Sequence, residues 1–274
     1  MTTATPPAAS GSSFYLGMKV LPAAEREAMF EVYRFCREVD DIADDQQVDR
    51  RARARELDRW RRDIDNLYAG REGGLAAGLA LPIARFGLDR DDFMAVIDGM
   101  AMDVERDICW PTLDLLDLYC DRVASAVGRL SVRIFGMERE PGVALAHHLG
   151  RALQLTNILR DIDEDAAIGR IYLPIEPVGA AGMTLGDVGA MLHDPRIDRA
   201  CREVAAIATL HYSQADDILA ARPRGHLLAP KLMAATYARL LRRMEKAGWA
   251  APRRRVRHNK LALLWIFARM RLSR

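Results

Sequence analysis

Residues 149–165 read LGRALQLTNILRDIDED, and this stretch decides the fold class. Positions 150, 154, 157, 161 and 165 are three or four residues apart, so they share one face of a helix over four turns. Glycine at the first position leaves space, and the four positions that follow carry side-chain oxygens. They are Gln154, Asn157, Asp161 and Asp165. Most of the remaining helix surface is apolar, as in a buried helix, and buried carboxylates require partners.

A second acidic motif lies upstream, where residues 33–44 read YRFCREVDDIAD. Its polar positions are Tyr33, Arg37, Asp40, Asp41 and Asp44. Aspartates four residues apart on a helix repel each other unless a cation lies between them. Mg²⁺ binds one or two carboxylates per ion together with phosphate oxygens and water. The two motifs therefore predict a small cluster of Mg²⁺ ions around a diphosphate, with Arg37 and Arg160 holding phosphate oxygens.

The composition of the 274-residue chain is that of a globular protein, with 50% hydrophobic and 28% charged residues. The net charge of +2 gives no basic field for nucleic acid, so no nucleic-acid partner is expected. The four cysteines form no CxxC pair, and the six histidines form no HExxH motif, so neither set is expected to bind a metal. With no signal peptide and no apolar run of roughly 20 residues, a cytoplasmic location is expected.

The pattern of apolar residues predicts an all-α chain. No alternating run indicates a strand. The glycines in 69–87 leave room for at most one short helix, and 166–190, with five glycines and two prolines, is expected to be the longest loop. No shift of composition divides the chain, so a disordered tail at 1–11 and one domain at 12–274 are expected. Helices are predicted at about 23–44, 48–68, 91–107, 113–135, 143–165, 196–221, 227–247 and 259–272.

Three stretches together resemble the squalene/phytoene synthase family of head-to-head prenyltransferases. Residues 149–174 fit the family's second signature, including the RIYLP sequence at 170–174. Residues 119–128, YCDRVASAVG, fit its first signature, and the DDIAD sequence at 40–44 lies at the place of its first acidic motif. The resemblance covers the chain from Ser12 to about Leu263.

The resemblance implies an isoprenoid-synthase-type helical bundle around a central cavity, where two prenyl diphosphates bind with two or three Mg²⁺ ions. One substrate loses diphosphate to give an allylic carbocation. The C2=C3 double bond of the other substrate attacks this cation, and loss of a proton closes a cyclopropylcarbinyl diphosphate. Such a cation requires a cavity that excludes water.

The residues that match the family's motifs, taken with the two acidic faces, give a set of expected roles. The expected catalytic residues are Tyr33, Tyr119, Arg160 and Asp161. The expected substrate-binding residues are Ser13, Phe14, Arg37, Gln154, Asn157, Arg170, Tyr172 and Tyr237. The expected metal ligands are Asp40, Asp41, Asp44, Asn157, Asp161 and Asp165. The small residues Ala124, Ser125 and Gly128 would lie beside a prenyl chain or allow close contact between helices.

Within the family, residues 12–18, 35–44, 102–105 and 164–170 are similar to the bacterial presqualene diphosphate synthases of hopanoid biosynthesis. These stop at the cyclopropyl intermediate and pass it to a downstream enzyme, so farnesyl diphosphate is the expected substrate and no NADPH is expected. The alternatives are a phytoene synthase, which joins two geranylgeranyl diphosphates, and a full squalene or dehydrosqualene synthase. A remote alternative is a non-enzymatic assembly factor of the same fold, but such relatives have lost acidic ligands that this chain keeps.

The last 36 residues form a basic segment on an acidic chain. They carry twelve Lys and Arg residues and one acidic residue, against 28 basic and 37 acidic residues in the remainder. With the apolar run at 261–268, this segment would contact an anionic membrane surface from the cytoplasmic side. Alternatively it forms a last helix that closes the bundle, with its arginines solvated or directed at the diphosphate site. Residues 254–257 are the candidates for binding phosphate groups.

Overall fold

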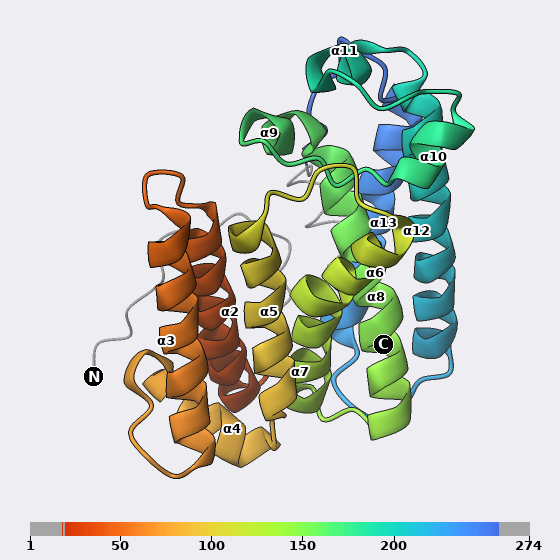
Figure 1. Ribbon diagram of the computed structural model, residues 1–274. Coiled ribbons are helices and arrows are strands. Elements are labelled where there is room, and N and C mark those ends of the chain that lie inside the picture. Colours follow the sequence, from red (N-terminus) through yellow and green to blue (C-terminus); the bar gives the residue numbers. More distant parts are fainter. Residues whose placement is uncertain (1–17, 19, 258–274) are drawn as a thin grey trace.

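The protein is seen in a computed structural model that describes residue 18 and residues 20–257 (Figure 1). Within that part of the chain the secondary structure is helical, apart from one β-bridge between Cys109 and Ile171. The α-helices are α2 (Ala23–Asp44), α3 (Arg50–Tyr68), α4 (Ala80–Phe86), α5 (Arg90–Glu105), α6 (Leu113–Cys120), α7 (Ala126–Ile134), α8 (Arg139–Arg160), α9 (Ile162–Ala167), α10 (Ile175–Ala180), α11 (Val188–His193), α12 (Ile197–Ala220) and α13 (Leu228–Ala247). A 3₁₀ helix, η1 (Gly74–Leu79), and a turn of π-helix, η2 (Asp121–Ser125), complete the set.

Two hydrophobic cores organise the bundle. One fills the space among α2, α3, α5 and α7, where the ring of Phe35 meets those of Trp60 and Phe93 edge-on at centroid distances of 5.3 Å. The other lies among α8, α12 and α13 and extends to the buried segment 171–173. In Figure 1 these two groups of helices stand side by side, with α7 between them.

The predicted helix at 113–135 contains a turn of π-helix. The amide of Ala126 donates to the carbonyl of Asp121, five residues back, so the turn holds one more residue than an α-helical turn. Directly after this turn the chain packs closely on α8. A Cβ atom on Gly150 would lie 2.7 Å from the Cα of Ser125, and one on Gly128 would lie 3.0 Å from the Cβ of Ala146. The small size of Ser125 and Gly128 thus allows close contact between helices, which is one of the two roles expected for them from the sequence.

Other boundaries differ from the predicted ones. The helix predicted at 143–165 begins earlier, at Arg139, and ends at Arg160, because Asp161 leaves helical geometry before α9 continues. Residues 69–87 hold both η1 and α4, and the long loop predicted at 166–190 contains α10 and the start of α11. The glycines and prolines of these stretches had suggested loops, but short helices that pack on the cores can contain such residues. The predicted tail at 1–11 and helix at 259–272 lie outside the described residues.

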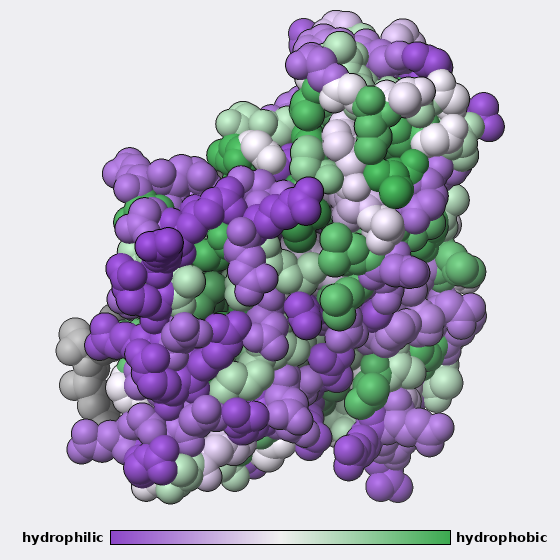
Figure 2. Space-filling model, in the orientation of Figure 1, coloured by the Kyte–Doolittle hydropathy of each residue, from purple (hydrophilic) through white to green (hydrophobic). Residues whose placement is uncertain are grey.

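The surface of the described part carries many charged side chains. The face in Figure 2 is largely hydrophilic over α3 and α5, with apolar residues scattered among polar ones. Among the described helices, none combines the length and the apolar character that a membrane span requires.

The contact between Gly150 and Ser125 gives a test of the packing. We expect Gly150→Ala to lower the free energy of unfolding by about 1–3 kcal/mol, because the new methyl group meets backbone atoms that cannot rotate away. Urea unfolding followed by circular dichroism measures this change. Gly179→Ala in α10 is the matched control, since its Cβ would meet nothing within 4 Å. Equal stability of the two variants would contradict the close packing.

Candidate active site

The two acidic motifs meet at one end of the bundle, where α2 and α8 end and where Arg170 contacts the last residues of α2. A cavity opens here, and its walls are mainly polar side chains. Its lining is Asp40, Asp44, Asp103, Tyr119, Gln154, Asn157, Ile158, Asp161, Asp165, Arg170 and Tyr172. Nine of the predicted site residues therefore converge, although they come from four separate segments of the chain.

The β-bridge explains how Arg170 and Tyr172 reach this cavity. The amide of Ile171 donates to the carbonyl of Ile108 at 2.8 Å, and the amide of Trp110 donates to the carbonyl of Ile171 at 2.9 Å. Residues 170–172 are therefore extended, and alternate side chains of an extended segment point to opposite sides. Arg170 and Tyr172 line the cavity, while Ile171 packs in the core.

Arg170 is the buried cation of the site, with 5% of its side chain exposed. Its guanidinium pairs with the carboxylate of Asp44 and donates to the carbonyl of Ala43 at 2.8 Å. Its Nε lies 3.8 Å from a carboxylate oxygen of Asp103. Burial alone would lower the pKa of Arg170, but these carboxylates outweigh burial and raise it. The guanidinium is therefore charged at every physiological pH and offsets part of the negative charge of the cavity.

Asp103 on α5 was not among the predicted site residues. It is 2% exposed and accepts hydrogen bonds from the hydroxyls of Tyr119, at 3.0 Å, and Tyr172, at 2.9 Å. The two tyrosine rings stack at a centroid distance of 4.9 Å. Burial raises the pKa of Asp103 and of both tyrosines. The signal available in the sequence was the i,i+4 spacing of Asp103 and Asp107, which is the spacing of the two acidic motifs.

The carboxylates of the cavity repel one another. Burial and the charge of Asp44 raise the pKa of Asp40 to about 6, and burial and the charge of Asp161 raise that of Asp165 to about 7. The side-chain oxygen of Asn157 is buried and has no hydrogen-bond partner. Crowded carboxylates beside an unpaired amide oxygen are the donor set that suits a hard divalent cation. The residues present therefore fit Mg²⁺.

Several predicted residues lie around the cavity rather than in its lining. Arg37 bridges Asp40, at 2.9 Å, and Asp41, at 2.5 Å, and the Asp41 side chain is 64% exposed. Arg160 pairs with Asp161 at 2.5 Å. Of the remaining predicted residues, Tyr237 lies beside Arg160, Tyr33 packs against the core that contains α2, and Ser13 and Phe14 lie outside the described residues.

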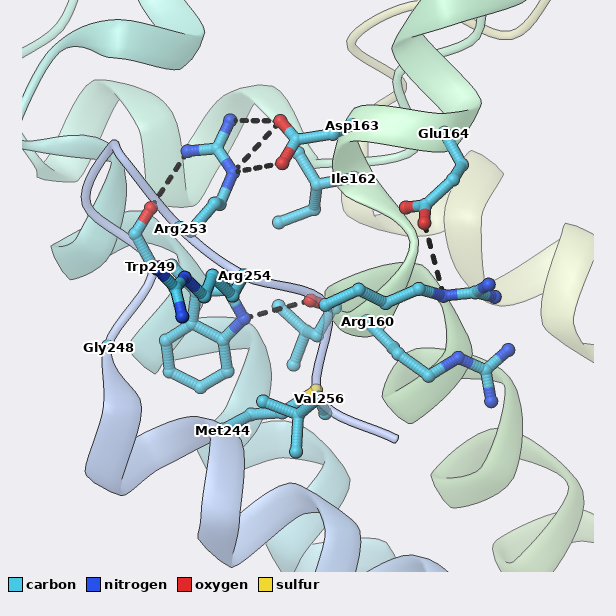
Figure 3. Close-up of a pocket in the computed structure, with 12 residues that line it drawn as sticks. Arg160, Ile162, Asp163, Glu164, Met244, Gly248, Trp249, Arg253, Arg254 and Val256 are labelled. Carbon is cyan, nitrogen blue, oxygen red and sulfur yellow. Dashed lines mark hydrogen bonds and ion pairs between the residues drawn. The ribbon is translucent and has the colours of Figure 1, made fainter. Parts of the chain in front are cut away.

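The basic segment after α13 packs beside the acidic residues of α9. Figure 3 shows Arg253 on the carboxylate of Asp163, with a shortest distance of 2.6 Å. The indole of Trp249 donates to the carbonyl of Leu159 at 2.9 Å and anchors the segment. Arg255 pairs with Asp161 at 2.6 Å, so this segment contributes a cation to the edge of the site. The expected alternative in which tail arginines are directed at the diphosphate site agrees with this contact.

Comparison with known proteins establishes the family. The family described as squalene/phytoene synthase matches residues 8–262. The chain belongs to this family. A presqualene diphosphate synthase of Zymomonas mobilis is 59% identical over 97% of this chain and 91% of its own length. One of Sinorhizobium fredii is 49% identical over 96% of this chain and 95% of its own length. The phytoene synthase of Arthrospira platensis is 34% identical over 70% of this chain and 65% of its own length.

Solved structures confirm the predicted all-α isoprenoid-synthase fold. A dehydrosqualene synthase crystallised in complex with a ligand superposes with a TM-score of 0.79 at 25% identity, covering 97% of this chain and 93% of that one. The squalene synthase HpnC of Alicyclobacillus acidocaldarius superposes with a TM-score of 0.76 at 27% identity, covering 88% of this chain and 89% of that one.

The repulsion among the carboxylates is expected to lower the free energy of unfolding when no metal is bound. The folded pKa of Asp165 is about 7, above its unfolded value of roughly 4, so the folded state binds the proton more tightly. This contribution to stability is complete below about pH 4 and is lost as the pH rises to about 7. We expect Asp165→Asn without divalent metal to raise the free energy of unfolding by about 1–2 kcal/mol at pH 8.

The same variant should show no such gain at pH 4, where the wild-type carboxyl is protonated. Urea unfolding at the two pH values measures the difference. Asp58→Asn on α3, whose carboxylate is 55% exposed, is the control and should change stability little at either pH. A loss of stability in Asp165→Asn at pH 8 would show that this carboxylate is structural.

Proposed function

We propose that this protein condenses two molecules of farnesyl diphosphate head to head into presqualene diphosphate, releasing one diphosphate and one proton. The observation that carries the proposal is the meeting of two carboxylate faces and the unpaired oxygen of Asn157 around one cavity. The 59% identity to a presqualene diphosphate synthase supports the choice of product within the family. Phytoene synthase activity is the second candidate, and full squalene or dehydrosqualene synthase activity is the third.

The residues that would hold two or three Mg²⁺ ions are those whose oxygens line the cavity. They are Asp40, Asp44, Asn157, Asp161 and Asp165. Mg²⁺ bound there would neutralise the charge that develops on the departing diphosphate. Asp41 was also predicted as a ligand. Its side chain is 64% exposed and forms an ion pair with Arg37, so we assign it to holding that arginine at the rim of the cavity.

The arginines of the site would bind the diphosphate. Arg37 pairs with Asp40 and Arg160 pairs with Asp161, so each of the two acidic motifs has a guanidinium beside a carboxylate that lines the cavity. Charge-assisted hydrogen bonds from both guanidiniums would orient the leaving group once they exchange part of their contact with these aspartates for phosphate oxygens. Arg170 is buried more deeply and fixes Asp44 in place. Gln154, which lines the cavity below Asn157, is assigned to the substrate.

The paired tyrosines have a role set by where their protons point. Each hydroxyl has one proton, and Tyr119 and Tyr172 both donate to Asp103. The two hydroxyl oxygens also lie 3.2 Å apart, and the lone pairs that neither this contact nor the bonds to Asp103 use are left for the cavity. Oxygen lone pairs and stacked aromatic faces stabilise a nearby cation, so we assign the pair to the allylic carbocation and to water bound at the metals. Asp103 acts as the positioning residue for both tyrosines.

Product analysis tests the function directly. Purified protein with Mg²⁺ and farnesyl diphosphate should give a thirty-carbon diphosphate by mass spectrometry, with the same product whether or not NADPH is present. Squalene that forms only with NADPH would make the protein a squalene synthase. Phytoene from geranylgeranyl diphosphate would place it in the carotenoid branch. Absence of diphosphate release with either substrate would indicate a non-enzymatic role.

The tyrosine assignment predicts a particular kinetic change. We expect Tyr119→Phe to lower kcat about 10- to 100-fold with little change in KM, because the lost contact acts mainly on the transition state. Tyr68→Phe is the control, since that hydroxyl donates to the carbonyl of Leu88 and lies outside the cavity lining. Steady-state assays of diphosphate release measure both constants. A rise in KM at unchanged kcat would assign Tyr119 to substrate binding alone.

A peripheral membrane contact and transfer of the product to a downstream enzyme of hopanoid synthesis complete the proposal. The product is a lipid, and Arg254 and Arg257 are exposed in the basic segment. We expect the protein to float with phosphatidylglycerol vesicles at low salt but not with phosphatidylcholine vesicles. The double variant Arg254→Gln and Arg257→Gln should float less. Equal recovery with both kinds of vesicle would contradict an electrostatic contact.

A further inference from the structure

Three histidines converge on the flank of the bundle, away from the acidic cavity. His147 and His148 are neighbours on α8, and His211 lies on α12. One possible ligand atom from each of the three lies within 4.8 Å of those of the other two. The Nδ1 atoms of His148 and His211 are 3.0 Å apart. The sequence had suggested no cluster, because 63 residues separate the second histidine from the third.

The helices that carry these histidines are firmly packed together. α8 and α12 lie side by side, and the hydroxyls of Thr156 and Tyr212 hydrogen-bond across them at 2.9 Å. Tyr212 directly follows His211, and the hydroxyls of Thr156 and Tyr212 are both buried. The relative position of the histidine backbones is therefore fixed by the core. A set of ligands held by a rigid scaffold loses little entropy when it binds an ion.

The spacing of the ligand atoms suits a small transition-metal ion. Zn²⁺ binds imidazole nitrogen at roughly 2.0–2.1 Å in tetrahedral sites, so two such nitrogens lie about 3.3 Å apart. The Nδ1 pair at 3.0 Å is near that value, and the third ring offers a nitrogen within 4.8 Å of a ligand atom of each of the other two. Imidazole favours Zn²⁺, Cu²⁺ and Ni²⁺, whereas Mg²⁺ prefers oxygen ligands. The histidines and the aspartates would therefore select different metals.

The electrostatic surroundings also suit a cation. Burial, together with the neighbouring imidazoles and Arg151, lowers the pKa of His211 to about 4. The pKa values of His147 and His148 are also lowered, with burial as the largest cause. Neutral imidazole is the form that binds metals, and each of these shifts favours the neutral form. Arg151 is the nearby positive charge, but Asp117 holds it in a two-pronged pair at 2.6 and 2.9 Å.

We propose that His147, His148 and His211 form a binding site for one transition-metal ion, with Zn²⁺ as the primary candidate and water as the fourth ligand. Asn157, a proposed Mg²⁺ ligand on α8, follows His147 by ten residues, which is about 15 Å along the helix axis. The ion would therefore take no part in the reaction at the acidic cavity. It would join α8 to α12 and stabilise the helix that carries Gln154 and Asn157.

Zinc titration of the untagged, chelator-treated protein tests this proposal. Excess Mg²⁺ is kept present to occupy the acidic cavity. We expect isothermal titration calorimetry at pH 7.5 to show one equivalent of Zn²⁺ bound, and Tm to rise by about 5 °C when free Zn²⁺ exceeds its Kd about 100-fold. Co²⁺ in place of Zn²⁺ should give the intense visible absorption of four-coordinate cobalt.

Matched variants separate the outcomes. His211→Ala, or His148→Gln if the former folds poorly, should abolish the binding, the Tm shift and the cobalt spectrum while diphosphate release continues. His193→Ala, which removes an exposed histidine that contacts only its own helix carbonyl in the described structure, should leave all three unchanged. Asp161→Asn should also retain Zn²⁺ binding. Equal Zn²⁺ binding by His211→Ala and wild type, or no stoichiometric binding by wild type, would overturn the proposal and leave a simple imidazole hydrogen bond.

Discussion

The buried guanidinium of Arg170 is the interaction on which the rest of the site depends. It belongs to the segment 170–172, whose neighbours lie in the core of α8 and α12, and it reaches across to Asp44 and the carbonyl of Ala43 at the end of α2. It therefore joins the two hydrophobic cores at the place where the cavity opens. A buried charge is costly unless it is paired, and here the counter-charges are the carboxylates of Asp44 and Asp103, which line the cavity. The position of the acidic motifs and the closure of the bundle are thus fixed by the same contacts.

The cavity combines two opposed demands. Carboxylates must face one another closely enough to share cations, and the folded chain must tolerate their repulsion when no cation is present. The chain meets the second demand partly with arginines, since Arg37, Arg160 and Arg255 each hold an aspartate of the motifs. Protonation reduces the remaining repulsion, because the pKa values of Asp40 and Asp165 are raised toward neutrality. These raised pKa values are the physical consequence of bringing several buried carboxylates to one cavity.

Much of the fold could be predicted because it depends on local periodicity. The bounds of α2 agree with the apolar pattern, and the acidic faces followed from the spacing of their own residues. The break at Asp161 could not be predicted, because it accompanies contacts with a guanidinium 94 residues away. Asp103 was missed because the partners that reveal its importance, Tyr119 and Tyr172, come from two later segments. The sequence shows which side chains share a helix face, but only tertiary packing shows which faces meet.

The turn of π-helix between α6 and α7 has a consequence for how this chain can vary. One extra residue in a helix rotates everything beyond it by about 100°. Tyr119, before the turn, faces the cavity, while Ser125, at its end, faces α8. Removal of a single residue between them would put one of these two faces out of phase, whichever residue was lost. The spacing from 119 to 125 is therefore a length constraint, and insertions or deletions there are excluded more strictly than substitutions.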